Sequence, residues 1–358
     1  MGSLEAAVNR AIIYSDPPTS ATQIVELPIE KPGPGQVLVR LFYSGVCHTD
    51  LGFCSNSFGL PNPAPKGQVG GHEGVGEVVE QGPGVTTPAI GAKVGVKYAA
   101  DACLNCDNCL VGGETSCPSV KVSGYYTPGT FQQYVVSSAT YLTPIPDGID
   151  LAGAGPLMCG GITVYTALKR AGTRFGDWVL VSGAGGGLGH LAIQYAKAIG
   201  AQVIALDHGS KKSFCEELGA DAFVDFTKFE TDEELKEEVW KISKSGVKTV
   251  LCCVSGNRAY EQSMDFLGFR GTLVCLGVPP AGGLGASLAS RVNAMIMSEL
   301  TIFAIKSGNR QDAKECLDIA ARGLVKTHYK LRGMDELTAI FHEMEEGTIS
   351  GRVVIDLR

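Results

Sequence analysis

The sequence predicts an α/β fold in which a mainly-β first part precedes a doubly wound parallel sheet. Three observations predict it. Apolar, β-branched runs such as Gln36–Ser44 lie between glycine and proline clusters in the first third of the chain. From about Leu151, apolar runs alternate with amphipathic helical stretches. Glycine supplies 47 of the 358 residues, which is typical of many tight turns rather than of a helical bundle.

The expected elements follow this rhythm in order. The first part has expected strands at Gln36–Ser44, Gly74–Glu80 and Thr130–Val136. The second part has expected strands at Trp178–Ser182, Gln202–Asp207, Ala222–Phe226, Thr249–Val254 and Gly271–Leu276. The helices expected between them are Leu188–Ile199, Lys211–Leu218, Asp232–Ser243 and Arg258–Leu267. After Glu299 we expect a strand, helices at Gln311–Arg322 and Met334–Glu346, and a last strand at Val353–Leu357. Helices between strands predict parallel pairing.

Charge and composition exclude several classes of function. The net charge is -7 with no long Lys/Arg run, which disfavours nucleic-acid and anionic-membrane partners. The stretch from Trp178 to Ala196 carries no charge and is long enough to span a bilayer, but five glycines between Gly183 and Gly189 favour a strand, a turn and a helix. Twelve cysteines without the pattern of a signal peptide indicate a reducing compartment, and we expect a cytoplasmic protein.

Four cysteines gather in one short segment, at about residues 101–120. They are Cys103, Cys106, Cys109 and Cys117. Four thiolates at this spacing can surround one zinc ion and leave no coordination position open, so the site is expected to be structural. Two disulfides or an iron–sulfur cluster are the alternatives. The reducing compartment disfavours disulfides, and no other motif indicates electron transfer, so we favour zinc.

A second set of metal-ligating residues is scattered along the chain. Cys47 lies in CHTD, His72 in GHEG and Cys159 in MCGG. Two cysteines and one histidine would leave one zinc position open for water or substrate, as a catalytic site requires. Spacing alone does not bring them together. Taken singly, the cysteines also fit small buried residues and the histidine fits the protein core.

A glycine-rich turn follows the expected strand at Trp178–Ser182. It reads GAGGGLG, with glycines at Gly183, Gly186, Gly187 and Gly189 around Leu188, and it departs from a strict GxGxxG. Such a turn before a helix can approach a pyrophosphate. The next strand ends at Asp207, where a carboxylate can accept both ribose hydroxyls and repel a 2′-phosphate, so NAD is favoured over NADP. Asp207 also fits a helix cap.

These motifs together resemble the zinc-dependent, medium-chain alcohol dehydrogenases of the yeast type. The most specific are GVCHTD, GGHEGVGEVV, the four-cysteine lobe, SGYYTPGTFQQY, CGGITVYTALK, GGLGHLAIQYAKAIG and ARGLVK. The resemblance covers nearly the whole chain. It implies a GroES-like catalytic domain over residues 1–156, a Rossmann NAD-binding domain over 157–298, and a segment 299–358 that returns to the catalytic domain. It also implies a homotetramer.

The resemblance assigns roles to individual residues. Cys47, His72 and Cys159 would bind catalytic zinc, with Glu73 close behind the metal and Asp50 orienting His72. Thr49 would hydrogen-bond the alcohol oxygen and pass its proton outward. Positions that match coenzyme contacts are His48 and Arg352 at the pyrophosphate, Lys212 near the adenosine ribose, and Val278. The reaction implied is reversible hydride transfer between an alcohol and NAD, giving an aldehyde or ketone.

The chain departs from this pattern at two places. Many relatives have a histidine that ends the proton relay where this chain has Gly52, so installing histidine there is predicted to change the pH profile. In the substrate pocket Phe58, Tyr98 and Val278 stand near positions where the yeast type has two tryptophans and a methionine. These smaller residues predict a pocket wider than ethanol needs, although drift with compensating side chains explains them nearly as well. Cys54 fits a plain pocket residue better than a reactive thiol.

Four functions therefore compete. An NAD-dependent zinc alcohol dehydrogenase is favoured, and a carbonyl reductase of a specialised fungal pathway is its close alternative. A zinc-free carbonyl or enoyl reductase would lack the complete ligand set of Cys47, His72 and Cys159 and the lobe. A non-catalytic zinc- and nucleotide-binding protein would have no need of Thr49 or Glu73.

Overall fold

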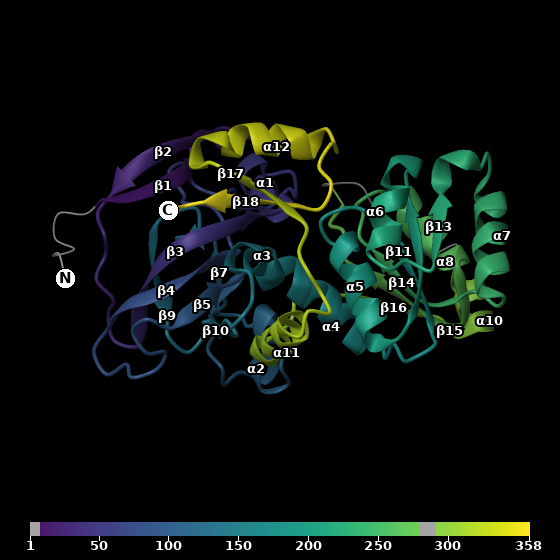
Figure 1. Cartoon of the computed structure of the whole chain (residues 1–358), viewed down its shortest axis with the longest axis horizontal. Helices are drawn as coiled ribbons and strands as arrows, with labels where there is room; N and C mark the ends of the chain where they lie inside the picture. The colour runs from purple at the N-terminus through teal and green to yellow at the C-terminus, as the bar shows by residue number, and fades with distance from the viewer. Residues whose placement is uncertain (1–7, 280–290) are drawn as a thin grey trace. The chain divides into compact units, whose positions relative to one another are not determined.

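The structure is a computed structural model that describes residues 8–279 and 291–358. Its contacts divide the chain into two compact units (Figure 1). The first unit comprises residues 1–162, 307–321 and 327–358. The second unit comprises residues 163–306 and 322–326. Each unit has its own main sheet and its own core.

The first unit is rich in short strands, as the sequence predicts. Its strands are β1 (Asn9–Tyr14), β2 (Thr22–Leu27), β3 (Gln36–Val46), β4 (Gly74–Gln81), β5 (Lys93–Val96), β6 (Ala99–Asp101), β7 (Lys121–Ser123), β8 (Tyr126–Thr127), β9 (Tyr134–Ser138), β10 (Thr143–Pro144), β17 (Tyr329–Arg332) and β18 (Arg352–Asp356). Its helical elements are α1 (His48–Ser55), α2 (Asp107–Leu110), η2 (Glu114–Ser116), α3 (Leu151–Pro156), η3 (Leu157–Gly161), α11 (Arg310–Ala321), η6 (Met334–Glu336) and α12 (Leu337–Glu345).

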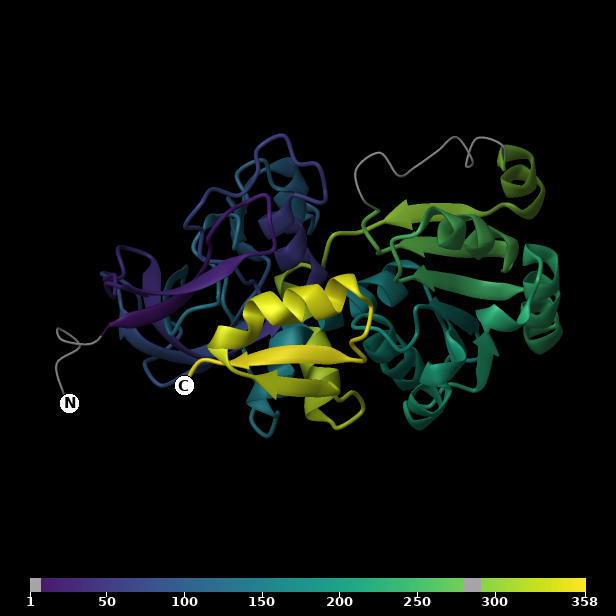
Figure 2. The ribbon, with the colours of Figure 1, turned by 90° about the horizontal axis from the view of Figure 1, so that it is seen from above.

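The long strand β3 is the centre of the first unit. In the seven-stranded sheet it pairs with β4, β9 and β18, all antiparallel. Val353 of β18 lies opposite Val46, the last residue of β3. Figure 2 shows β17 and β18 with α12 alongside them. The C-terminal segment therefore returns to the first unit and completes the sheet beside the strand that leads to Cys47.

Two expectations for this unit need correction. The expected strand Thr130–Val136 begins only at Tyr134, as β9, because Thr130 and Phe131 donate their backbone N–H groups to the carbonyls of Gly71 and Gly70. The hairpin of β1 and β2 and the short strand β17 were not expected from the sequence. Their polar and apolar residues alternate too weakly to stand out from loops.

The second unit alternates strands and helices. Its strands are β11 (Trp178–Ser182), β12 (Gln202–Asp207), β13 (Ala222–Asp225), β14 (Val247–Cys252), β15 (Leu267–Cys275) and β16 (Thr301–Ala304). Its helical elements are α4 (Ile162–Arg170), α5 (Gly189–Ile199), η4 (Gly209–Lys211), α6 (Lys212–Glu217), η5 (Phe226–Lys228), α7 (Asp232–Ser243), α8 (Asn257–Asp265) and α10 (Val292–Ser298).

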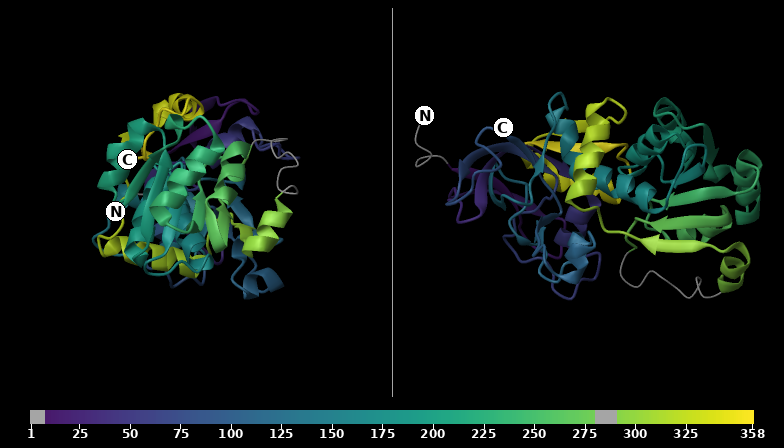
Figure 3. Two further views of the ribbon diagram at one scale, coloured as in Figure 1. Left: turned by 90° about the vertical axis from the view of Figure 1, so that its right-hand side faces the viewer. Right: turned by 90° about the horizontal axis from the view of Figure 1, so that it is seen from below.

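All strand pairs of the second sheet are parallel, in the order β13-β12-β11-β14-β15-β16. Helices cover both faces of the sheet (Figure 3). Leu180 packs into one core cluster with residues of α7 and α8, while its neighbours Val179 and Val181 are buried on the opposite face. This order and these two covered faces confirm the predicted doubly wound fold. The chain runs outward from β11 through β12 to β13, and then continues with β14 on the other side of β11. The strand order therefore switches at β11, which the glycine-rich turn follows.

The apolar stretches of the chain are core elements of this fold. Trp178–Ala196 forms β11, a turn and most of α5, as predicted. The helical run Leu151–Arg170 is also apolar and 20 residues long, and 83% of its most apolar window is buried within the protein. Burial to this extent is typical of a core helix rather than of a membrane span.

Candidate active site and cysteine lobe

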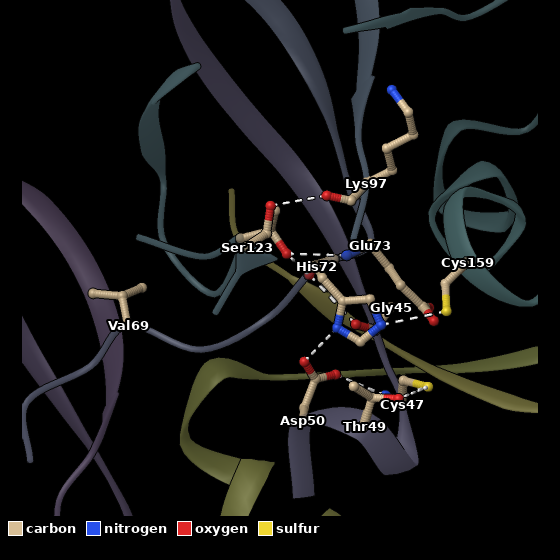
Figure 4. A network of polar contacts seen from close by, with 12 residues as sticks. Gly45, Cys47, Thr49, Asp50, Val69, His72, Glu73, Lys97, Ser123 and Cys159 are labelled. Atoms are coloured by element: carbon tan, nitrogen blue, oxygen red, sulfur yellow. Dashed lines mark hydrogen bonds and ion pairs between the residues drawn. The ribbon is translucent and has the colours of Figure 1, made fainter. Parts of the chain in front are cut away.

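Three separate elements of the first unit bring Cys47, His72 and Cys159 together (Figure 4). Cys47 directly follows the last residue of β3 and is the N-cap residue of α1. His72 lies just before β4. Cys159 lies in η3, a π-helical turn between α3 and α4. Single π-helical turns are frequent at functional sites, because the extra residue turns a side chain out of the regular helix pattern.

The ligand atoms of these residues form a compact donor set. Together with a carboxylate oxygen of Glu73, they lie within 4.8 Å of one another. Nε2 of His72 is 3.3 Å from Sγ of Cys159. His72 is fully buried and Cys47 is 9% exposed. Two sulfurs and one imidazole nitrogen at this separation fit a zinc ion with an open fourth position.

Asp50 fixes the orientation of His72 from behind. Its Oδ1 lies 2.7 Å from Nδ1 of His72, and its Oδ2 accepts a hydrogen bond of 2.9 Å from the backbone N–H of Cys47. Asp50 is itself fully buried. A carboxylate on Nδ1 leaves Nε2 free for a metal, and such partners tune the affinity of the site.

Glu73 forms a buried ion pair with Arg352, across 279 residues of sequence. Burial raises the pKa of Glu73 to about 7, and the Arg352 guanidinium opposes that shift. A Cβ on Gly45 would come within 2.0 Å of Oε2 of Glu73, so the carboxylate needs glycine at that position. The sequence analysis gave Arg352 only a coenzyme role and missed this ion pair. No sequence pattern links two residues so far apart.

The other residues predicted around the alcohol site lie on α1, in the turn after it and in the bend between β5 and β6. The Thr49 hydroxyl oxygen is 3.7 Å from Sγ of Cys47. His48 is exposed at the first position of α1. The Tyr98 ring meets the His72 ring edge-on, with 5.9 Å between centroids. The Phe58 ring lies against Gly52.

Cys54 is a core residue in this structure. Its side chain is fully buried, and its Sγ donates to the carbonyl of Thr19 at 3.0 Å. Burial raises the pKa of the Cys54 thiol to about 12. This environment agrees with a plain structural cysteine rather than a reactive thiol.

The cysteine lobe brings its four sulfurs together as well. The sulfurs of Cys103, Cys106, Cys109 and Cys117 lie within 4.8 Å of one another, and those of Cys103 and Cys117 are 3.5 Å apart. Glu114 anchors the lobe to the rest of the unit. Its carboxylate accepts hydrogen bonds from the Tyr141 hydroxyl at 2.9 Å and from Nε of Arg310 at 3.0 Å. The four-sulfur donor set fits a closed structural zinc site.

The glycine-rich turn and Asp207 meet in the second unit. Gly183 has a φ of 72°, a conformation that favours glycine. A Cβ on Gly189 would lie 2.1 Å from the carbonyl oxygen of Gly183, so glycine allows α5 to begin close to β11. Oδ2 of Asp207 accepts a hydrogen bond of 2.8 Å from the backbone N–H of Gly185. The remaining turn residues, Gly186, Gly187 and Leu188, lead directly into α5.

A cavity of about 450 Å³ adjoins Asp207. Both apolar and polar side chains line it, among them Phe226, Val254, Asp232, Arg258 and Gln262. A cavity of this size that combines apolar walls with a carboxylate suits the base and ribose of a nucleotide. Two other predicted coenzyme residues lie on the surface of the second unit. Nζ of Lys212 is 3.7 Å from Oε1 of Glu216 in an exposed ion pair, and the Val278 side chain is 55% exposed. Apart from Gly183 and Asp207, the residues that line the cavity were not predicted from the sequence.

Comparisons with known proteins identify the family. The alcohol dehydrogenase GroES-like domain matches residues 33–147, and the zinc-binding dehydrogenase domain matches residues 187–322. The chain is 46% identical to alcohol dehydrogenase 2 of Emericella nidulans over 357 residues, covering 97% of each chain. It is 40% identical to an alcohol dehydrogenase of Schizosaccharomyces pombe over 333 residues, covering 93% of each. The chain therefore belongs to the zinc-binding alcohol dehydrogenase family, as its motifs predict.

Solved structures agree with this assignment. Cinnamyl alcohol dehydrogenase from Sorghum bicolor has a TM-score of 0.85 and 26% identity, and the match covers 98% of each chain. Acetophenone reductase from Geotrichum candidum, solved with NAD, has a TM-score of 0.83 and 27% identity, with 98% of this chain and 97% of that chain covered. The predicted enzyme class, an oxidoreductase that acts on alcohols with zinc and a nicotinamide coenzyme, is confirmed.

Proposed function

We propose that this enzyme prefers NAD and transfers hydride reversibly between a primary or secondary alcohol and the coenzyme, giving an aldehyde or ketone. The convergence of Cys47, His72 and Cys159 in one buried cluster, with the Thr49 hydroxyl beside it, carries this proposal. A zinc ion held by these three residues would supply a Lewis acid that lowers the pKa of an alcohol hydroxyl.

The residues of the chain prepare the site for that chemistry. Asp50 holds the imidazole of His72 so that Nε2 faces the sulfurs. Thr49 carries a hydroxyl that can accept the proton of the alcohol and donate its own proton outward. A bound nicotinamide would supply the acceptor for the hydride of the alcohol carbon, and the hydroxyl proton of the alcohol would leave through Thr49. His72 and Glu73 are fully buried and Cys47 is 9% exposed, which limits the access of water to these donor atoms.

Preference for NAD follows from Asp207. Its carboxylate stands at the end of β12 beside the cavity, where it would accept ribose hydroxyls and repel a 2′-phosphate. We expect Asp207→Ala to lower the ratio of kcat/KM for NADH to kcat/KM for NADPH by about tenfold. Asp225 ends the neighbouring strand in register with Asp207, so Asp225→Ala is a matched control. An unchanged ratio in Asp207→Ala would remove this argument.

The alcohol is proposed to be larger than ethanol. Tyr98 faces His72 in the first unit, and Phe58 packs against α1. Both side chains are smaller than the tryptophans at the matching positions of the yeast type. Val278 is likewise smaller than the methionine at its matching position. The favoured alternative is a carbonyl reductase of a specialised fungal pathway that acts on a bulkier substrate. The acetophenone reductase match is compatible with it.

Initial rates of carbonyl reduction with NADH test the proposed wide pocket and the carbonyl reductase alternative. The substrates run from acetaldehyde through aliphatic ketones to bulky aromatic carbonyls. If a bulky carbonyl has the highest kcat/KM, the wider pocket stands, and Tyr98→Trp should shift preference toward acetaldehyde. Tyr126→Trp is the control, since Tyr126 is 58% exposed. If acetaldehyde is best, the smaller residues reflect drift. If NADH supports turnover of no carbonyl on this panel, the proposed preference for NAD and the proposed substrate range both fail.

A homotetramer in the cytoplasm completes the proposal. β16 is an outer strand of its sheet. Nearby α10 exposes Val292, Ile296 and Met297, of which Met297 is 73% exposed. Among the described residues β16 has no strand partner on its outer side, and such an edge next to apolar side chains suits association with a second copy of the chain. Light scattering of the purified protein measures its mass, and a fluorescent fusion in a fungal host reports its compartment.

A further inference from the structure

His190 is a fully buried histidine in the first turn of α5, directly after the glycine-rich turn. Its Nδ1 lies 3.1 Å from the backbone carbonyl oxygen of Gly186. Because a carbonyl oxygen only accepts hydrogen bonds, Nδ1 must carry the proton and donate. The backbone N–H of His190 donates to the same oxygen, also at 3.1 Å. The side chain and the backbone of one residue therefore hold the Gly186 carbonyl together.

This double hydrogen bond fixes the peptide group between Gly186 and Gly187. The peptide group is planar and trans, so the carbonyl of Gly186 and the N–H of Gly187 point in opposite directions. Since the carbonyl is held toward His190, the N–H of Gly187 points away from the helix. Among the residues that the structure describes, this N–H has no acceptor. An outward N–H at the N-terminal end of a helix favours a phosphate oxygen.

The packing of α5 keeps the His190 ring in this position. The ring stacks on the Phe214 ring of α6, with 6.3 Å between centroids and 23° between the ring planes. One turn further along α5, Nε2 of Gln194 donates to the backbone carbonyls of His190 and Lys326, each at 2.9 Å. All of these residues belong to the second unit. A rotation of the ring away from Gly186 would break the contact with α6.

The start of the glycine-rich turn is held differently. Oδ2 of Asp207 accepts the backbone N–H of Gly185 at 2.8 Å. A Cβ on Gly185 would lie 2.9 Å from Cβ of Lys211, so the chain after β12 also packs closely on the turn. The N–H of Gly185 is thus bound by the protein itself, whereas the contact with His190 leaves the N–H of Gly187 directed outward. The second of these groups is the one that suits a ligand.

We propose that His190 is a positioning residue for the pyrophosphate of the nicotinamide coenzyme. The inference deepens the proposed function, on whose coenzyme it rests. The ring N–H of His190 holds the Gly186 carbonyl, and the N–H of Gly187 is thereby directed toward a phosphate oxygen before the coenzyme binds. Without this donor the peptide group gains freedom to turn, and binding must restore its orientation at a cost in affinity. The loss should concern the phosphates and not the adenosine.

A set of variants separates the hydrogen bond from the packing of the ring. His190→Phe keeps an aromatic ring against Phe214 and removes the donor. His190→Asn removes the ring but keeps an N–H at the place of Nδ1, because this nitrogen is bonded to Cγ in both side chains. His190→Gln places the amide one bond further out and replaces His190→Phe if that variant folds poorly. His342→Phe is the matched control, since His342 is exposed in the first unit.

The main measurement is calorimetric titration of the zinc-loaded protein with ADP, which carries the pyrophosphate, and with adenosine, which carries no phosphate. We expect His190→Phe to raise the Kd of ADP by about tenfold, as for a weakened hydrogen bond to a charged group, and to leave the Kd of adenosine within about twofold. His190→Asn should bind ADP within about threefold of wild type. In steady-state assays of His190→Phe, the KM of NADH should rise much more than kcat falls.

The outcomes separate this role from a structural one. If His190→Phe binds ADP as tightly as wild type, the positioning role is wrong. It is also wrong if ADP and adenosine weaken equally, or if His190→Asn loses as much ADP affinity as His190→Phe, because packing then accounts for the effect. A wild type that prefers NADPH would contradict the proposed preference for NAD. Both coenzymes carry the pyrophosphate, so a selective loss of ADP affinity in His190→Phe would still support the role of His190.

Discussion

The two clusters of metal-ligating residues lie in the same unit but are assembled in different ways. In the lobe, Cys103 and Cys117 are 14 residues apart, and the chain between them curls around the four sulfurs. In the buried cluster, His72 and Cys159 are 87 residues apart, and they meet only because the sheet and the π-helical turn place them together. One site is a local property of its segment, and the other is a property of the whole fold.

The two clusters also differ in how deeply they are embedded in the first unit. The buried cluster has Asp50 and the ion pair of Glu73 and Arg352 packed around it. The lobe exposes Leu110 and Val111, at 72% and 85%, and depends on Glu114 for its attachment. We therefore expect changes in the buried cluster to remove activity and changes in the lobe to remove stability.

The largest expected effect is on catalysis. Cys159→Ala removes one sulfur from the open-position site, so kcat/KM should fall about 10³-fold or more, because the Lewis acid contributes several kcal/mol to the reaction. The zinc content should fall toward one ion per chain, and the thermal midpoint should change little. Activity assays, metal analysis and thermal melts measure the three. A variant that keeps both metals and its rate would contradict the assignment of Cys159.

The lobe should show the reverse pattern. Cys109→Ser opens the four-sulfur site, and because a structural zinc ion contributes directly to folding, the midpoint should fall by about 10 °C or more. The initial kcat/KM of freshly prepared, folded protein should stay within a few-fold of wild type. Cys316→Ser is the control, since Cys316 is buried in the same unit but belongs to neither cluster. Loss of activity without loss of stability would show that the lobe is not structural.

A smaller effect is expected at the residue behind the histidine. Asp50→Asn keeps the shape but removes the charge that holds Nδ1 of His72. Metal affinity or activity should fall by about 10–100-fold, as for other partners of metal-bound histidines. Competition with a chromogenic chelator measures the affinity of the buried site separately from that of the lobe. Equal affinities in variant and wild type would leave Asp50 with a packing role only.

The same contrast explains what could be predicted from the sequence. The lobe was predictable because its four cysteines are close in sequence. So was α7, which begins after Thr231 as predicted, because Thr231 and Glu234 form a capping box that local sequence encodes. The doubly wound sheet was predictable from its regular alternation. The convergence of Cys47, His72 and Cys159 could be expected only through the resemblance to known enzymes, because no local pattern specifies it.

Contacts that are set by the path of the backbone were beyond prediction. Arg352 meets Glu73 because β18 pairs with the end of β3, and that pairing depends on the whole first unit. Phe58 meets Gly52 because the left-handed Asn56 turns the loop back onto α1. Both contacts depend on the path of the backbone, which the identity of single residues does not reveal.

The smallest expected effect concerns Lys97, a buried amine next to the lobe. It is 4% exposed, donates to the backbone carbonyl of Tyr141 and lies 4.2 Å from the centre of the Tyr141 ring. Burial lowers the pKa of Lys97 to about 7; Glu114 opposes this shift and Arg310 adds to it. An unfolded lysine has a pKa of about 10.4. Between these values the unfolded chain therefore binds more protons than the folded chain, so the contribution of Lys97 to stability rises with pH, by at most about 1.4 kcal/mol per pH unit.

Lys97→Met removes this titration. The stability of wild type relative to Lys97→Met should therefore increase from pH 7 to pH 9, and it should be flat below pH 6, where both states carry the charge. Denaturant melts of the zinc-loaded proteins at each pH give the difference, in which shared titrations cancel. Lys236→Met is the control, because Lys236 lies on the surface of α7 in an exposed ion pair and should show no such slope. A flat or falling difference between pH 7 and 9 would mean that Lys97 stays charged inside the fold, held by Glu114 and the Tyr141 ring.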